Sequence, residues 1–267
     1  YTLCVYLLHM REYYRWEKKY HFNQILKSTE VSEWVSRKED YWSDIEKEEY
    51  MPLPWLNSDI DPFDVAAVNN RLIPMGYCYG AGIGRFGKPI FFVAKLKSVD
   101  VGENYKIYST DEEIVRELVA PPAMTLGDTI SIREQSLKRV LWEMVEEWLW
   151  KKPQNAMWRT LKCYGSIDEP TKAIESITDI FIESAILHEL GERVCVDLLG
   201  KEWEEMIFSL VDDISMESAA RAVRDNLADC LVLLPALINQ NEQAPLHLYF
   251  ATLTEFRKKL FPTLVDA

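Results

Sequence analysis

The sequence has few cysteines and no apolar run long enough to cross a membrane. Its five cysteines are scattered, and no two of them form a CxxC pair, which argues against a disulfide framework and against a cysteine-based zinc site. No stretch of about 18 consecutive apolar residues is present, and the first residues lack the basic flank of a signal peptide. We therefore expect a cytoplasmic protein with reduced thiols and no membrane insertion.

Basic residues are also in short supply. Lys and Arg together number 30 against 43 Asp and Glu, so the formal net charge is −13 at pH 7. Because such a charge repels a phosphate backbone, nucleic acid is not expected as a partner. Hydrophobic residues make up 48% of the chain, as in an ordinary globular protein, and the expected associations are a protein partner or a homo-oligomer.

Helical periodicity covers most of the chain, and strand-like patterns are confined to one region. The predicted helices are 1–20, 31–49, a helix that begins near Asp61, 111–118, 129–151, 170–199, 202–211, 215–238 and 246–260. The predicted strands are 77–79, 89–96 and 105–108.

These patterns predict an α+β fold that is predominantly α-helical, with a helical bundle-like core and a small antiparallel β-sheet near residues 77–108. We expect a single domain over residues 1–267. It would be helical over 1–74, contain the sheet at 75–109, and be helical again over 110–267.

A glycine-rich segment lies between the first two predicted strands. It contains Gly80, Gly82, Gly84 and Gly87, but no helix follows it, and Lys88 precedes proline rather than Ser or Thr. A nucleotide-binding loop needs those features, so a structural hairpin is the favoured interpretation. The alternative is a loop that contacts a small anionic ligand through Arg85 and Lys88.

The segment 182–195 carries the strongest candidate for chemistry. His188 and Glu192 are one helical turn apart on a largely apolar helix, so their side chains can meet. One interpretation is a buried hydrogen-bonded pair with a purely structural role. The other is a site for a divalent metal such as Zn, Fe or Mn, with Glu183, His188 and Glu192 as ligands and Glu189 as the catalytic base.

A metal site would require a further donor from this helix or from another one. Glu183, Glu189, Asp225 and Asp229 are the candidates, in that order. Asp225 and Asp229 are one turn apart, with Arg221 one turn earlier, and an exposed Arg–Asp pair is the simpler interpretation. The alternative is that their helix packs on the His188 helix and contributes a carboxylate.

Several segments together resemble an uncharacterised bacterial protein family, a domain of unknown function. They are residues 11–17, 61–65, 79–89 and 188–192. The resemblance runs through most of the chain, but the family has no established activity, cofactor or fold, so it implies no function. It does imply that the segments belong to one architecture.

Two hypotheses of function follow. The favoured one is a non-catalytic interaction or accessory protein, in which acidic and aromatic surface residues bind another protein. The alternative is a metal-dependent enzyme, a hydrolase or an oxidoreductase, with a site centred on His188 and Glu192. The sequence does not indicate a substrate for such an enzyme.

Overall fold

The computed structural model describes residues 2–48, 60–84, 89–210 and 212–266. The helices are α1 (Leu3–Glu17), α2 (Ser28–Ile45), α3 (Val65–Leu72), α4 (Glu134–Lys151), α5 (Ala156–Cys163), α6 (Ile174–Leu199), α7 (Lys201–Ser209), α8 (Ile214–Ala228), α9 (Leu234–Gln240), α10 (Gln243–Thr252), α11 (Glu255–Leu260) and α12 (Thr263–Asp266). Short 3₁₀ helices span Ile73–Met75 and Pro170–Lys172, and a π-helix, η4, spans Asp229–Leu233. The strands are β1 (Tyr77–Ile83), β2 (Pro89–Val101), β3 (Lys106–Val115), β4 (Ala123–Leu126) and β5 (Thr129–Arg133).

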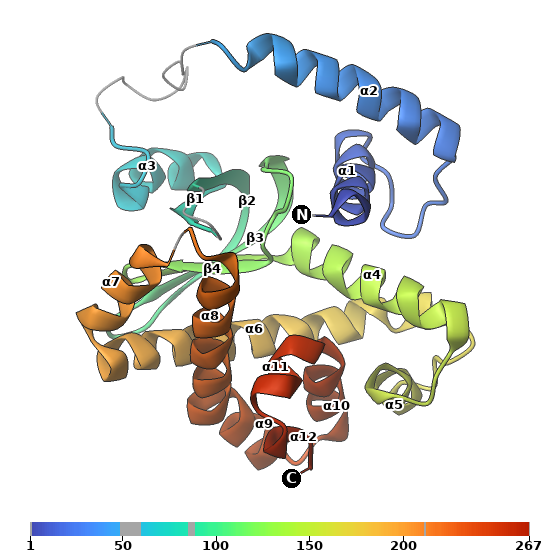
Figure 1. Cartoon of the computed structure of the whole chain (residues 1–267), viewed down its shortest axis with the longest axis vertical. Coiled ribbons are helices and arrows are strands. Elements are labelled where there is room, and N and C mark those ends of the chain that lie inside the picture. The colour runs from blue at the N-terminus through green and yellow to red at the C-terminus, as the bar shows by residue number, and fades with distance from the viewer. Residues whose placement is uncertain (1, 49–59, 85–88, 211, 267) are drawn as a thin grey trace.

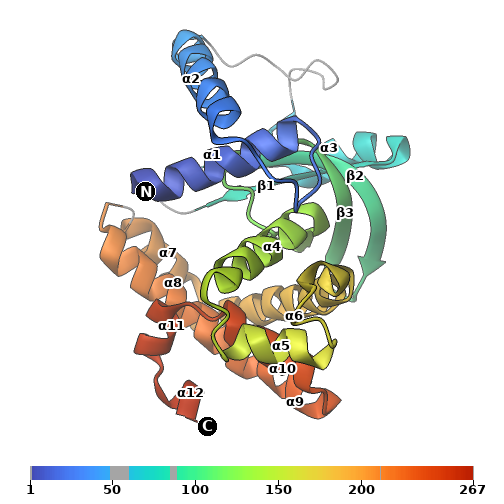
Figure 2. The same ribbon diagram turned by 90° about the vertical axis from the view of Figure 1, so that its right-hand side faces the viewer.

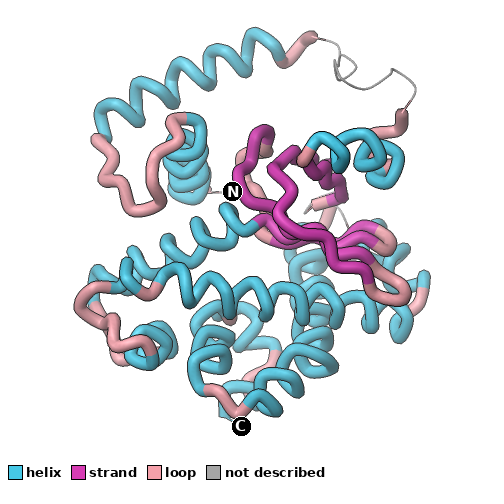
Figure 3. The backbone as a smooth tube through the Cα atoms, turned by 180° about the vertical axis from the view of Figure 1, so that it is seen from behind, coloured by secondary structure: helices cyan, strands magenta, loops and turns pink. Residues whose placement is uncertain are grey.

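The sheet lies between two groups of helices. In Figure 1, α1, α2 and α3 lie above the sheet, and the helices from α4 onwards lie beside and below it. Figure 2, turned by 90°, shows the same order, and Figure 3 shows the strands enclosed between the two groups. The longest helix, α6, packs against β4 and β5 and crosses α8.

The expected small antiparallel sheet near residues 77–108 is wrong. The sheet has five strands in the order β1-β2-β3-β5-β4. Strands β3 and β5 are parallel, whereas the other neighbours are antiparallel. Two of the strands follow residue 120, so the structure has a substantial mixed sheet on which the helices pack, in place of a helical bundle-like core.

Two segments predicted as helical belong to strands instead. Residues 129–133 form β5 because Ile130 and Ile132 alternate with polar residues and are completely buried against α6, a strand period rather than a helical one. The predicted helix 111–118 is also wrong. Strand β3 continues to Val115 because Glu113 and Val115 still pair with β2. A further helix, α5, was not predicted.

The β1–β2 hairpin agrees with the structural interpretation of the glycine-rich segment. The two strands pair from Tyr77 opposite Lys95 to Ile83 opposite Pro89. Arg85 and Lys88, the predicted anion contacts, lie outside the described residues. Strand β1 also approaches the opposite edge of the sheet. A Cβ atom on its Gly82 would lie 2.5 Å from the terminal methyl of Met124 in β4. The sheet therefore curls until its two edge strands, β1 and β4, come close together.

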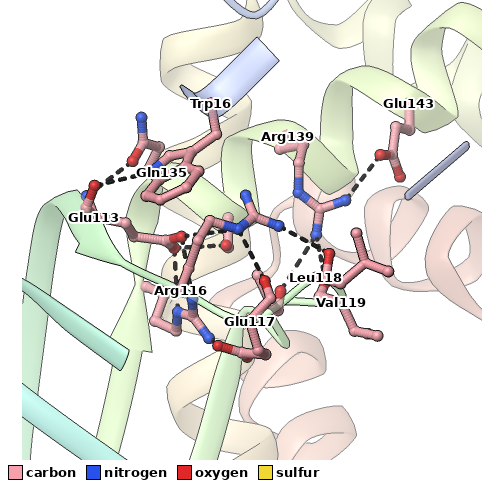
Figure 4. Close-up of polar contacts among 12 residues, drawn as sticks. Trp16, Glu113, Arg116, Glu117, Leu118, Val119, Gln135, Arg139 and Glu143 are labelled. Carbon is pink, nitrogen blue, oxygen red and sulfur yellow. Dashed lines mark hydrogen bonds and ion pairs between the residues drawn. The ribbon is translucent and has the colours of Figure 1, made fainter. Parts of the chain in front are cut away.

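A buried group of charges joins the sheet to α1 and α4 (Figure 4). Arg133 and Glu113 are buried with fully enclosed side chains, and Arg133 Nε donates to Glu113 Oε1 at 3.1 Å. The side chain of Trp16, from α1, donates through its Nε1 to the carbonyl oxygen of Glu113 at 2.8 Å. Arg116 packs on the same carboxylate, and Arg139 of α4 donates to the carbonyl oxygens of residues 119 and 120.

Within the described ranges, no helix combines the length and the apolar character needed to cross a membrane. The five cysteines are free thiols.

Candidate metal centre and adjoining cavity

Helices α6 and α8 approach each other closely at Gly191. A Cβ atom at this position would lie 2.5 Å from the carbonyl oxygen of Ala228 and 2.9 Å from its carbonyl carbon. Backbone atoms cannot move aside as the end of a flexible side chain can, so a residue without a Cβ is required there. The contact holds His188 and Glu192, which flank Gly191 on α6, beside the C-terminal end of α8.

The chain changes from α-helix to π-helix at this crossing. The π-helix η4 begins at Asp229, which is only 1% exposed. Single π-helical turns inside helices often occur at functional sites. Here the turn places Asp229 against α6, where its Oδ1 lies 2.6 Å from Nδ1 of His188. Its Oδ2 accepts a hydrogen bond from Nη2 of Arg257 in α11.

The second ring nitrogen of His188 faces a different carboxylate. Nε2 lies 3.6 Å from Oε1 of Glu192, which also accepts a hydrogen bond of 2.6 Å from Arg224 Nη2. Asp225 lies beside them, with its Oδ1 3.7 Å from the same arginine nitrogen. One donor atom from each of His188, Glu192 and Asp225 lies within 4.8 Å of the others, so two helices bring three metal-ligating groups together.

The hydrogen bonds among His188, Glu192 and Asp229 shift the pKa values of all three side chains. Burial alone would lower the pKa of His188, but its hydrogen bonds to Asp229 and Glu192 raise the pKa well above the usual value for histidine. Burial alone would raise the pKa values of the two carboxylates, yet the hydrogen bond from His188 lowers that of Asp229, and His188 and Arg224 lower that of Glu192 to about 2. The imidazole is therefore a cation held between two carboxylates.

The negative charge of Asp225 is less well compensated than those of Asp229 and Glu192. Its pKa is raised, first by burial and then by the negative charge of Glu192. The closest cation to Asp225 is Arg224. This arginine lies 3.7 Å from Asp225 but only 2.6 Å from Glu192. Among the three grouped donors, Asp225 therefore gains most from an additional positive charge.

A cavity of about 290 Å³ opens beside His188. Apolar side chains form most of its wall, among them Pro122, Ala123, Leu137, Phe181, Leu233 and Leu248. The polar side chains in its wall include those of His188, Glu189, Asp229, Tyr249 and Arg257. A mostly apolar cavity with a few converging polar groups is the usual form of a small-molecule site.

Glu189 lies in the cavity wall and is 6% exposed. Its Oε2 accepts a hydrogen bond of 2.6 Å from the hydroxyl of Thr125 in β4. Burial, followed by the negative charge of Glu192, raises the pKa of this carboxyl group to about 7. The residue predicted as catalytic base is thus next to His188 and in contact with the cavity.

The structure separates Glu183 from the group. Glu183 is exposed on α6, so Asp225 takes the place of the third donor that was first assigned to Glu183. The predicted exposed pair of Arg221 with an aspartate is also wrong, because Arg221 binds Glu217 at 2.9 Å. Asp229, considered in that exposed pair, is one of the most buried side chains.

A comparison with known protein families identifies the chain. Residues 1–133 match the model of the N-terminal domain of a family of unknown function, DUF6866, and residues 138–267 match the model of its C-terminal domain. The chain belongs to this family. The resemblance to an uncharacterised family is thereby confirmed. Neither curated proteins nor solved structures gave a match to the chain.

The N-terminal DUF6866 model ends with β5 at residue 133, and the C-terminal model begins at residue 138, within α4. His188, Glu192, Asp225 and Asp229 all belong to the C-terminal domain. Thr125, which binds Glu189, belongs to the N-terminal domain, as do Pro122 and Ala123 of the cavity wall. The group of candidate metal donors therefore lies within one family domain, whereas residues of both family domains line the cavity beside it.

Sequence reasoning missed the two arginines of the site. Arg224 was within a segment that was considered, but nothing in its spacing distinguishes it from Arg221. Arg257 lies in another helix, 28 residues beyond Asp229, so only the tertiary fold brings it to the group. The one local signal was Gly191, a glycine in the middle of a long apolar helix, which indicates a close approach of another backbone.

Proposed function

We propose that the protein is an enzyme that binds a divalent transition metal through His188, Glu192 and Asp225. Its substrate would be a small molecule held in the adjoining cavity. The observation that carries the proposal is the grouping of these three donors within 4.8 Å of one another. A mixed set of one imidazole and two carboxylates suits zinc, iron or manganese.

The orientation of His188 supports a ligand role. Its Nδ1 is engaged with Asp229 at 2.6 Å, which leaves Nε2 toward Glu192. A metal bound at Nε2 would displace the proton that this nitrogen carries in the cationic imidazole. Metal-binding histidines usually donate their other ring N–H to a carboxylate, which fixes the tautomer and the ring orientation. Asp229 is placed for that role, and Arg257 in turn holds Asp229.

A centre with these donors can serve hydrolysis or oxidoreduction. In either case the metal would act as a Lewis acid or redox centre beside the cavity. Glu189 supplies a carboxylate in the cavity wall next to His188, and Arg224 would give up its contact with Glu192 to the metal.

Removing a donor is expected to reduce metal affinity. Protein treated with a chelator should take up about one equivalent of Zn²⁺ or Mn²⁺. His188→Ala or Asp225→Asn should weaken that binding by about 100-fold or more, and Asp229→Asn by roughly 10- to 100-fold. Elemental analysis and calorimetric titration measure these effects, and circular dichroism checks that each variant is folded.

Matched controls lie on the same and neighbouring helices. His247→Ala removes a histidine outside the group, and Asp197→Asn removes an exposed carboxylate of α6; both should bind metal like the wild type. Equal metal content in His188→Ala and in the wild type would show that the group is a structural ion network and would remove the enzyme proposal.

A second candidate is the interaction protein that the sequence favoured. Large apolar side chains are exposed on consecutive elements, with Leu198 at the end of α6, Phe208 on α7 and Ile214 at the start of α8. Leu198 and Phe208 are 63% and 66% exposed, and exposed apolar surface of this kind often marks a contact with another protein.

In its testable form, this second candidate is a homo-oligomer formed through α7 and its neighbours. Light scattering should then give a mass above that of one chain. The double variant Phe208→Ser/Ile214→Ser should return the mass to that of the monomer without loss of helical content. A wild-type protein that is monomeric over a wide range of concentration would contradict it.

A further inference from the structure

A second cavity lies apart from the candidate metal centre, and residues of both family domains line it. Its volume is about 460 Å³. One side of its wall comes from α1, the loop after α1, β2 and β3, and the other side comes from α4 and α6. Its wall shares no residue with the metal donors or with the cavity beside His188. The cavity is therefore a separate candidate for a ligand.

Basic residues are concentrated in the wall of this second cavity. They number six against five acidic residues, whereas the whole chain has 30 basic and 43 acidic residues. The six are Arg15, Lys19, Lys97, Arg116, Lys138 and Arg139. The side chains of the three arginines are 13% exposed or less, whereas three of the five acidic residues, Asp111, Glu175 and Asp179, are exposed. The buried part of the wall is therefore rich in positive charge.

The charge of Arg116 is only partly compensated. Its hydrogen bonds go to neutral acceptors, because Nε donates to the carbonyl oxygen of Glu117 at 3.1 Å and Nη2 donates to that of Leu118 at 3.3 Å. Within the described part of the chain, its ion pair is with Oε2 of Glu113 at 3.7 Å. The same oxygen lies closer to Arg133, at 3.1 Å. Arg116 therefore shares a carboxylate that Arg133 holds more tightly.

Arg139 adds a second positive charge beside Arg116 (Figure 4). Its Nη2 donates to the carbonyl oxygens of residues 119 and 120, and its Nη1 binds Glu143, whose side chain is 35% exposed. Burial, followed by the charges of Arg139 and Arg116, lowers the pKa of His9. Burial first, with Arg139 contributing, lowers the pKa of Arg116 to about 10. The guanidinium group stays charged at neutral pH, and an added anion would be stabilised there.

Lys138 is the basic group best placed to bind a ligand. Its Nζ lies 5.8 Å from the ring centre of Phe22, which also lines the cavity. The Lys138 side chain is 28% exposed, whereas that of its partner Glu175 is 72% exposed. An exposed ion pair contributes little to stability, so a ligand carboxylate can take the place of Glu175. Trp16 and Phe22 give the same wall flat apolar surfaces.

We propose that this cavity binds a small carboxylic acid with a flat apolar body, whose carboxylate accepts hydrogen bonds from Lys138 and Arg139. The body packs on Phe22 and Trp16, and Arg116 stabilises the bound charge. Lysine and arginine bind carboxylates through charge-assisted hydrogen bonds. The inference goes beyond the metal-dependent enzyme and is independent of it, because the two sites share no residue.

Ligands of other charge fit the wall less well. An ammonium group would face the guanidinium groups of the buried part and find only the exposed carboxylates as partners. A neutral ligand would leave the excess positive charge as it is. Because the wall has one more basic than acidic residue, a single carboxylate balances its charges.

Three probes of similar shape and different charge test the inference. Phenylacetate, phenethyl alcohol and phenethylamine share one ring and differ in the polar end. Titration followed by NMR or calorimetry should give phenylacetate an affinity about tenfold higher than that of phenethyl alcohol, because hydrogen bonds between charged groups are the stronger ones. Phenethylamine should bind most weakly. Phenylacetate should also shift the indole NMR signal of Trp16, but not that of Trp150, which is 82% exposed and lies outside the cavity wall.

Variants locate the binding. Lys138→Met keeps the apolar stem and should lower the affinity for phenylacetate about tenfold, while phenethyl alcohol binds as before. Lys258→Met is the matched control, since Lys258 is 30% exposed, pairs with the exposed Glu255 and lies outside the cavity wall; it should bind like the wild type. Phe22→Ala should weaken binding of both probes, and circular dichroism checks that each variant is folded.

The outcomes that overturn the inference are distinct from those that concern the metal. No binding of phenylacetate at millimolar concentration, equal affinity for acid and alcohol, or a preference that persists in Lys138→Met would each overturn it. Binding should be the same in chelator-treated and in metal-loaded protein, and binding that requires metal would place the acid at the candidate metal centre instead. A preference for phenylacetate in protein that takes up no metal supports the acid site and contradicts the metal-dependent enzyme.

Discussion

The Arg133→Met variant is expected to lose about 3–5 kcal/mol of unfolding free energy, which corresponds to a fall in Tm on the order of 10 °C. Arg133 is 0% exposed, and its Nε donates to Oε1 of Glu113 at 3.1 Å. Nη1 donates to Glu117 at 2.7 Å, and the guanidinium lies 4.3 Å from the ring centre of Phe92. Methionine keeps the apolar stem against Phe92 but leaves Glu113 buried with less compensation.

The deficit of this variant should depend on pH. Burial alone would raise the pKa of Glu113, but the charges of Arg133 and Arg116 lower it below the usual range. A carboxylate with a lowered folded-state pKa adds stability above its unfolded pKa, about 4.3, and loses it as the pH falls through the folded value. The difference between wild type and Arg133→Met should therefore be largest near neutral pH and shrink below about pH 4.

Two comparisons make the test specific. Lys27→Met breaks an exposed ion pair with Glu30 and should cost no more than about 1 kcal/mol. Adding Glu113→Gln to Arg133→Met should recover part of the loss, because removing both charges is less costly than leaving one buried. A deficit that is the same at pH 3 and pH 7 in chemical denaturation would contradict the role assigned to Glu113.

Helical periodicity predicted most of the long helices because their apolar faces pack on neighbours throughout their length. It failed at the start of α4, where Ile130 and Ile132 can be placed on a helical face as well as on a strand. The decisive signal was the strict alternation through Thr129–Arg133 after the turn at Gly127, which has a φ of +59°. The parallel pairing of β3 with β5 has no local signal, because it depends on how residues 116–128 return to the sheet.

The candidate site was predictable only in part. The spacing of His188 and Glu192 correctly places both side chains on one face of a helix. It could not rank Asp225 above Glu183, because that order depends on which side of α6 faces α8. A helical wheel that takes Val223, Leu227 and Leu231 as the buried stripe places Asp229 on the exposed side, but Val223 and Leu231 are 47% and 41% exposed, and Ala222 and Asp229 are buried instead.

Replacement of Gly191 by valine is expected to have the second large effect, on both stability and metal binding. The Cβ of any residue at this position would lie 2.5 Å from the carbonyl oxygen of Ala228, well inside van der Waals contact. Overpacking of this kind typically costs about 1–3 kcal/mol, and the contact with backbone places Gly191→Val at or above the upper end. Thermal and chemical unfolding measure the loss.

The effect on metal binding follows from the direction of the strain. Helices α6 and α8 can relieve the clash only by moving apart, and that movement separates His188 and Glu192 on one helix from Asp225 on the other. Zn²⁺ affinity should therefore fall even under conditions where the variant is folded. Ser176→Val places the same β-branched side chain at an exposed position of α6 and should leave both properties nearly unchanged. A folded Gly191→Val protein with wild-type Zn²⁺ affinity would show that the distance between the two helices does not control the site, and would exclude Asp225 as a ligand.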